Sequence, residues 1–255
     1  MAPVLQAVLW GLVQGITEFL PISSDGHLVL IPALVGFAPP DLATTAVLHL
    51  GTLLAVVVYF RKDLWSLRRA RSDPEARHLL GLLLIGSLPA ALALLVVREI
   101  DRLQRSSTAA ALFLLVTGLV LVFVDRLPHG KREFDQATPV DALLIGFAQL
   151  LAVLPGISRS GFTIATGLAR GFERVATARF SFLLGVPAIT AAGLFELISL
   201  ANDGGIPRSA WLGVVVAGLT GYLAIAFLLR MLARTGLSGY GFYCLALGLL
   251  ALIVL

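Results

Sequence analysis

Long apolar runs separated by short polar stretches dominate this chain. A bilayer core about 30 Å thick needs roughly 20 apolar residues of helix, so runs near that length predict transmembrane helices. Six such runs are present, over residues 43–60, 79–97, 106–124, 177–199, 209–229 and 237–255. Pro89 and Pro187 lie inside two of them, where they predict kinks because neighbouring membrane helices can satisfy the carbonyl groups that a proline frees.

Two further apolar segments, residues 4–36 and 140–170, are each cut in the middle by a cluster of Pro, Ser and Gly. We expect each to form a broken, re-entrant helix, since irregular backbone at membrane depth is tolerated only inside protein or around a water-filled cavity. The pattern therefore predicts an all-α integral membrane protein with six transmembrane helices and two re-entrant broken helices. Residues 1–255 are expected to form a single membrane domain.

The two broken segments resemble each other at an offset of 135 residues. The first reads GLVQGITEFLPISSDGH and the second GFAQLLAVLPGISRSGF, so that Gln14 corresponds to Gln149. Three predicted spans separate the copies, which means that the second copy enters the membrane from the opposite face. The sequence therefore predicts an inverted repeat of residues 1–125 and residues 140–255, with the two breaks facing one another around a pocket near the midplane.

Composition supports a membrane protein and excludes several other classes. Of the 255 residues 58% are apolar and 13% are charged, against about 45 to 50% and about 25% in an average soluble domain. A soluble enzyme and a disordered chain are therefore excluded, and the single cysteine excludes a disulfide scaffold. The net charge of +4 is small and lies in loops, so we expect it to reflect membrane topology and not nucleic-acid binding.

Lys and Arg residues set the expected orientation, because cytoplasmic loops carry an excess of them. If the loop at 61–77 is cytoplasmic, alternation of the six spans places 126–139, 170–179 and 230–234 on the same side. These four stretches hold 14 of the 19 basic residues. Both termini are then expected on the outer face.

The first break carries polar and charged side chains that helix packing does not require. Gln14 and Glu18 are four residues apart, so their side chains project from one face of a helix and can bind the same ligand. Hydroxyl groups, a carboxylate and an imidazole follow, from Ser23, Ser24, Asp25 and His27. A charge at membrane depth costs about 2.5 to 3.5 kcal/mol, which makes a functional role the default hypothesis.

The second break supplies a guanidinium among hydroxyl groups, from Ser158, Arg159, Ser160 and Thr163. Arginine forms forked, charge-assisted hydrogen bonds, and the N–H groups at a helix start favour an anion, so this break predicts phosphate binding. A carboxylate beside a phosphate needs a cation between them. Glu18, with the amide oxygen of Gln14, therefore predicts a Mg²⁺ or Ca²⁺ site.

At these residues the sequence resembles the bacitracin-resistance family of undecaprenyl-diphosphate phosphatases, membrane proteins that recycle the lipid carrier of the bacterial cell wall. The resemblance rests on Gln14 and Glu18, Ser23-Ser24 and His27, and Pro155-Gly-Ile-Ser158-Arg159-Ser160 with Thr163. It implies hydrolysis of undecaprenyl diphosphate to the monophosphate, a divalent cation and bacitracin resistance. It also implies a location in the inner (plasma) membrane, with the active site open to the periplasmic or outer face.

Catalytic roles are expected for Glu18, Ser24, His27 and Arg159, and substrate-binding roles for Gln14, Ser23, Ser158, Ser160 and Thr163. In this hypothesis Arg159 holds the phosphates, Glu18 positions the metal or acts as base, and Ser24 is the nucleophile. His27 accepts the proton from Ser24; a nucleophilic His27, or water activated by it, stays open. Thr163 and Gln149 are expected to add supporting hydrogen bonds.

The main alternative is a transporter or flippase of a polyprenyl phosphate lipid, because inverted repeats with broken helices are a transport architecture. Such a carrier would use Arg159 but would not need the nucleophile and base. His49 is expected to be a packing residue, and no role is assigned to Asp25 or Glu196. The sequence leaves the oligomeric state open, a dimer being one option.

Overall fold

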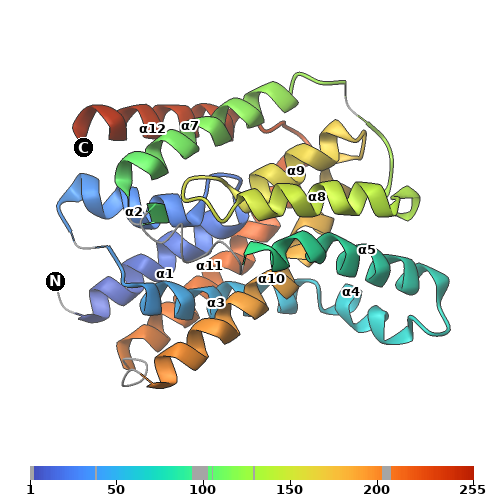
Figure 1. The fold of residues 1–255 in the computed structure, drawn as a ribbon, viewed down its shortest axis with the longest axis horizontal. Coiled ribbons are helices and arrows are strands. Elements are labelled where there is room, and N and C mark those ends of the chain that lie inside the picture. The colour runs from blue at the N-terminus through green and yellow to red at the C-terminus, as the bar shows by residue number, and fades with distance from the viewer. Residues whose placement is uncertain (1–2, 38, 94–102, 105, 129, 203–207) are drawn as a thin grey trace.

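The computed structural model describes residues 3–37, 39–93, 103–104, 106–128, 130–202 and 208–255 (Figure 1). In this part of the chain helices form the regular secondary structure, joined by turns and loops, and the one β-type pairing is an isolated bridge between Arg132 and Phe172. The helices are α1 (Pro3–Phe19), α2 (Ser24–Val35), α3 (Leu42–Tyr59), α4 (Arg61–Ser66), α5 (Pro74–Ala91), α7 (Ser107–Val124), α8 (Pro139–Leu151), α9 (Arg159–Ala169), α10 (Arg174–Asn202), α11 (Arg208–Leu232) and α12 (Ser238–Val254), with 3₁₀ turns at Leu67–Arg69 and Phe134–Gln136. The predicted all-α class is confirmed.

Both broken segments form the predicted pair of helices, α1 with α2 and α8 with α9. A serine caps the second helix of each pair, as its hydroxyl oxygen accepts a hydrogen bond from a backbone N–H three residues later. Ser23 accepts from Gly26 at 3.3 Å, and Ser158 accepts from Gly161 at 3.0 Å. The two caps occupy equivalent positions in the two copies of the sequence pattern.

Helix packing follows the same plan in both halves of the chain. The first helix of each broken pair packs against a long helix of the other half, α1 against α11 and α8 against α5, and α7 lies beside α12 (Figure 1). Glycines allow close approach: a Cβ on Gly11 would lie 2.6 Å from the Gly213 carbonyl oxygen, and one on Gly146 would clash with the Gly86 carbonyl. Helix packing therefore accounts for Gly11 and Gly146.

Two of the described helices are long and apolar enough to cross a membrane by themselves, Ser107–Val124 and Ala210–Leu232. A third span results if Thr44–Tyr59 and Arg61–Arg69, which meet at 71°, count as one bent helix. The end of the predicted span 79–97, with Arg98, Arg102 and Arg105 beyond it, lies outside the described residues. Large apolar side chains cover much of the exterior, as a lipid-facing surface requires; Ile253, for example, is 74% exposed.

Candidate active site

The two breaks face one another, as the sequence predicts, and they are in direct contact. The Arg159 guanidinium at the start of α9 donates from Nη2 to Oε1 of Glu18 at the end of α1, at 2.7 Å. Beside this pair, the Ser160 hydroxyl donates to the backbone carbonyl of Leu20 at 3.1 Å. An acidic residue of one break and a basic residue of the other therefore meet inside the bundle, although 141 positions separate them in the chain.

Glu18 is the centre of this site. Its side chain is buried, and beyond Arg159 its Oε2 atom accepts hydrogen bonds from the Ser24 hydroxyl at 2.6 Å and from the Gln14 amide at 3.1 Å. A buried carboxylate is tolerated when a cation and further donors compensate its lost hydration. The prediction that Gln14 and Glu18 share one helix face is confirmed. The Ser24 hydroxyl directs its proton at the Glu18 carboxylate.

Buried hydroxyl groups hold Arg159 and the second break in place. The Thr163 hydroxyl donates to the Arg159 carbonyl at 2.7 Å and lies 2.6 Å from the Ser181 hydroxyl, and Nη1 of Arg159 donates to the Ser181 carbonyl at 3.3 Å. The Thr117 hydroxyl donates to the Gly156 carbonyl at 2.8 Å. Thr163 therefore supports Arg159 as expected, while Ser181 and Thr117 were not predicted, because a hydroxyl within an apolar span gives no local signal of its partner.

His27 occupies a different place from the one that its expected role requires. Its Nδ1 lies 2.7 Å from the Ser23 carbonyl and its Nε2 lies 2.8 Å from the Tyr243 hydroxyl. Both ring nitrogens are thus engaged, while the Ser24 hydroxyl donates to Glu18. The structure therefore places a carboxylate, and not this imidazole, next to the hydroxyl of Ser24.

A second histidine faces the site, and the expectation that it only packs is wrong. His49 of α3 has its Nε2 3.6 Å from Oε2 of Glu18, and its Nδ1 lies 2.8 Å from the Thr45 carbonyl. The predicted span around it is apolar on every side, so no amphipathic pattern indicates which face meets the break. Only the packing of α3 against α1 brings this imidazole to the carboxylate.

Gln149, the counterpart of Gln14 in the second copy, lacks the expected hydrogen bond. Its side chain is buried, and neither its amide nitrogen nor its oxygen has a partner among the described residues. The reason lies in the sequence: Gln14 binds Glu18 four residues later, whereas the residue four positions after Gln149 is Val153. The two copies share their backbone plan and differ in this chemistry.

The oxygen atoms at this site fit a cation that takes only one or two of its ligands from the protein. Oε1 of Gln14 is buried beside Glu18 and has no hydrogen-bond partner among the described residues, and the Asp25 side chain, in the first turn of α2, is exposed. Within the described ranges, no group of three or more His, Cys, Asp or Glu could enclose a metal. Mg²⁺ often binds through one or two protein oxygens together with substrate phosphates, and this donor set fits that mode.

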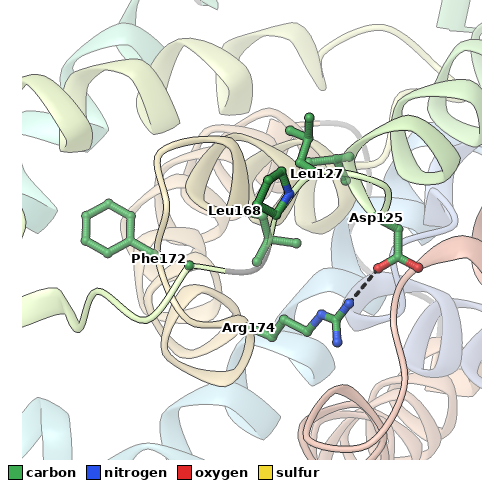
Figure 2. Close-up of a pocket in the computed structure, with 8 residues that line it drawn as sticks. Asp125, Leu127, Leu168, Phe172 and Arg174 are labelled. Atoms are coloured by element: carbon green, nitrogen blue, oxygen red, sulfur yellow. Dashed lines mark hydrogen bonds and ion pairs between the residues drawn. The ribbon is translucent and has the colours of Figure 1, made fainter.

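A separate small pocket lies by the end of α7 and is not this site (Figure 2). Its lining includes Asp125, whose carboxylate accepts from Arg174 at 2.9 Å and from the Ser238 hydroxyl at 2.6 Å. Burial alone would raise the pKa of the Asp125 carboxyl, but the hydrogen bonds from Ser238 and the nearby arginine hold it below its usual range. None of the residues predicted to bind phosphate lines this pocket. We therefore interpret the contacts of Asp125 as structural, because they join the end of α7 to the starts of α10 and α12.

Comparisons with known proteins agree with this geometry. A model of the family described as bacitracin resistance protein BacA matches residues 7–250, which include every site residue named above. A protein named undecaprenyl-diphosphatase from Thermomicrobium roseum is 44% identical over 98% of this chain and 98% of its own length. Proteins of the same name from Nocardioides sp. and Methanosphaera stadtmanae are 40% and 36% identical, cover this chain completely, and are themselves covered over 97% and 99%. Since the family model and these relatives extend over nearly the whole chain, this protein belongs to the BacA family of bacitracin resistance proteins.

Proposed function

We propose that this protein hydrolyses undecaprenyl diphosphate to undecaprenyl phosphate and inorganic phosphate, and so recycles the lipid carrier of the cell wall and confers bacitracin resistance. The observation that carries the proposal is the chain of contacts from the Ser24 hydroxyl through the Glu18 carboxylate to the Arg159 guanidinium. Phosphoryl transfer needs a nucleophile, a proton acceptor and a cation for the phosphate oxygens. The names of the relatives supply the substrate.

Ser24 and Glu18 perform the first chemical step of the mechanism. Oγ of Ser24 attacks the terminal phosphorus while its proton passes to Oε2 of Glu18, 2.6 Å away. The bond from that phosphorus to the bridging oxygen breaks, and undecaprenyl phosphate leaves with the electron pair. Water then attacks the phosphoserine, and the bond between phosphorus and the Ser24 oxygen breaks. The Ser24 oxygen takes its proton back from Glu18, and inorganic phosphate leaves with both protons of the water.

The protonation state of Glu18 determines whether Arg159 can interact with the substrate. In the structure its guanidinium pairs with the Glu18 carboxylate. Once Glu18 holds the Ser24 proton it is neutral, and the guanidinium is then free to interact with the phosphoryl oxygens on which charge accumulates. The N–H groups at the start of α9 add donors for the same anion, while the Ser158 and Ser160 hydroxyls, which already bond to each other and to the Leu20 carbonyl, hold this turn in place.

A divalent cation completes the proposal. Gln14 and Glu18 would hold Mg²⁺ or Ca²⁺ through their side-chain oxygens. When bound, such an ion would neutralise charge on the diphosphate.

Phosphate release by the purified protein tests the function directly. We expect release from undecaprenyl diphosphate, loss of release after addition of a chelator, and recovery on return of Mg²⁺ or Ca²⁺. Rapid quenching with substrate labelled in its terminal phosphate should trap the label on Ser24. Label on His27 would make that residue the nucleophile, and turnover without any labelled protein would indicate direct attack by water. Lipid movement across vesicles without phosphate release would favour the carrier alternative.

We further propose that the chain has six spans and two re-entrant helices in an inverted repeat, with the site and both termini facing the outer side. The exchanged packing of α1 with α11 and α8 with α5, the equivalent serine caps, and the distribution of Lys and Arg support this arrangement. Asp25 would then be reached from outside the cell, whereas the exposed Ser72 in the loop before α5 would not.

Thiol labelling tests this orientation, because the native Cys244 is buried. We expect a membrane-impermeant maleimide to label Asp25→Cys in intact cells, and to label Ser72→Cys only after permeabilisation. The reverse pattern would contradict the orientation, and labelling of both variants in intact cells would contradict it as well.

A further inference from the structure

His27 has no step in the proposed mechanism, although its side chain is buried beside the serines, at 1% exposure. Its hydrogen-bond partners define which nitrogen carries the proton. A carbonyl oxygen can only accept, so Nδ1, 2.7 Å from the Ser23 carbonyl, must be the protonated nitrogen. Nε2 then accepts from the Tyr243 hydroxyl at 2.8 Å.

The ring is neutral in this arrangement. No carboxylate in the described part of the chain forms an ion pair with His27, so an imidazolium there would be a buried charge without a partner. Tyr243 belongs to α12, at the opposite end of the sequence, and its ring stacks on the imidazole with centroids 5.6 Å apart and planes 11° apart. The contact therefore fixes both the tautomer and the orientation of the ring.

The carbonyl that His27 holds belongs to a strained residue. Ser23 has φ of +69°, a region that residues with a side chain rarely adopt. Its carbonyl accepts from Nδ1 of His27 and also from the backbone N–H of His27 at 3.2 Å. These two hydrogen bonds from His27 therefore fix the peptide group between Ser23 and Ser24. The orientation of this peptide group determines where the Ser24 hydroxyl points.

We propose that Tyr243 and His27 form a positioning pair for the serine turn: the tyrosine hydroxyl fixes the Nδ1–H tautomer of His27, which holds the Ser23 carbonyl and keeps the Ser24 hydroxyl on Glu18. The consequence for catalysis rests on the proposed function, whereas the hydrogen-bond arrangement does not. In this proposal the imidazole transfers no proton to or from the substrate.

Nitrogen NMR tests the arrangement without any activity. The chain has four histidines, so ¹⁵N-histidine labelling gives few signals, and the one that disappears in His27→Asn is assigned. In the unmodified protein we expect a neutral ring that is protonated at Nδ1. In Tyr243→Phe the Nε2 resonance should move toward that of a ring nitrogen whose lone pair accepts no hydrogen bond. Tyr240→Phe is the matched control, since it removes a hydroxyl from the same helix that donates instead to Met231. An Nε2–H ring in the unmodified protein, or an unchanged resonance in Tyr243→Phe, would overturn the proposal.

Kinetics separate a positioning role from proton transfer. The Asn side-chain amide can donate from the place of Nδ1, so His27→Asn should keep kcat within about tenfold, whereas His27→Leu should lose about a hundredfold or more. Tyr243→Phe should lower kcat about three- to tenfold, the effect of one hydrogen bond, with KM unchanged. Equal loss of kcat in the Asn and Leu variants would contradict positioning and return proton transfer to His27. A protein that releases no phosphate at all would refute the proposed function, and the NMR result would still decide the pair.

Discussion

Ser24→Ala is expected to lower kcat for phosphate release by at least about a thousandfold, because a methyl group can neither attack phosphorus nor form the phosphoserine. Binding of undecaprenyl diphosphate should change little, since Arg159 and the start of α9 remain. Steady-state phosphate release and equilibrium binding of the lipid would measure the two effects separately. The variant should also fail to retain label from the terminal phosphate.

Ser87→Ala is a suitable control for this experiment. Ser87 is another serine within a helix of the bundle, and its hydroxyl donates to the Leu83 carbonyl at 2.6 Å, away from the site. Its loss should leave kcat unchanged. A Ser24→Ala protein that retains more than a tenth of the original kcat would exclude Ser24 as the nucleophile.

Arg159→Ala should remove activity and also destabilise the protein. Loss of an arginine that stabilises charge in phosphoryl transfer costs about a thousandfold or more in kcat. The change also leaves the Glu18 carboxylate buried without its cation, which costs about 3–5 kcal/mol in the free energy of unfolding. Phosphate release and thermal unfolding in detergent would report the two losses.

A double variant separates these two effects. Glu18→Gln with Arg159→Gln removes both charges, so we expect it to recover most of the lost stability and none of the activity. Arg179→Gln is the control for arginine loss, because its ion pair with Asp63 is half exposed and should contribute less than about 1 kcal/mol. Full activity in Arg159→Ala would contradict the role of the guanidinium.

Local sequence was sufficient to predict the backbone of the site. Apolar segments interrupted by Pro, Gly and Ser must break, and spacing of four residues must bring Gln14 onto the face of Glu18, because both effects act within one or two helical turns. The repeat then predicted that the two broken segments meet, since irregular backbone at membrane depth must face protein or a water-filled cavity. The contact between them confirms that inference.

Tertiary packing decided the remaining contacts, and the reason is the same in each case. His49, Ser181 and Tyr243 lie on helices that are apolar around most of their circumference, so no periodicity shows which side faces the site. The role expected for His27 depended on which neighbour its ring would meet, and that neighbour, Tyr243, is 216 residues away. The sequence by itself determined the breaks and the charges within them, because these are local; only the packing of distant helices decided which groups touch them, because it depends on contacts that no local pattern encodes.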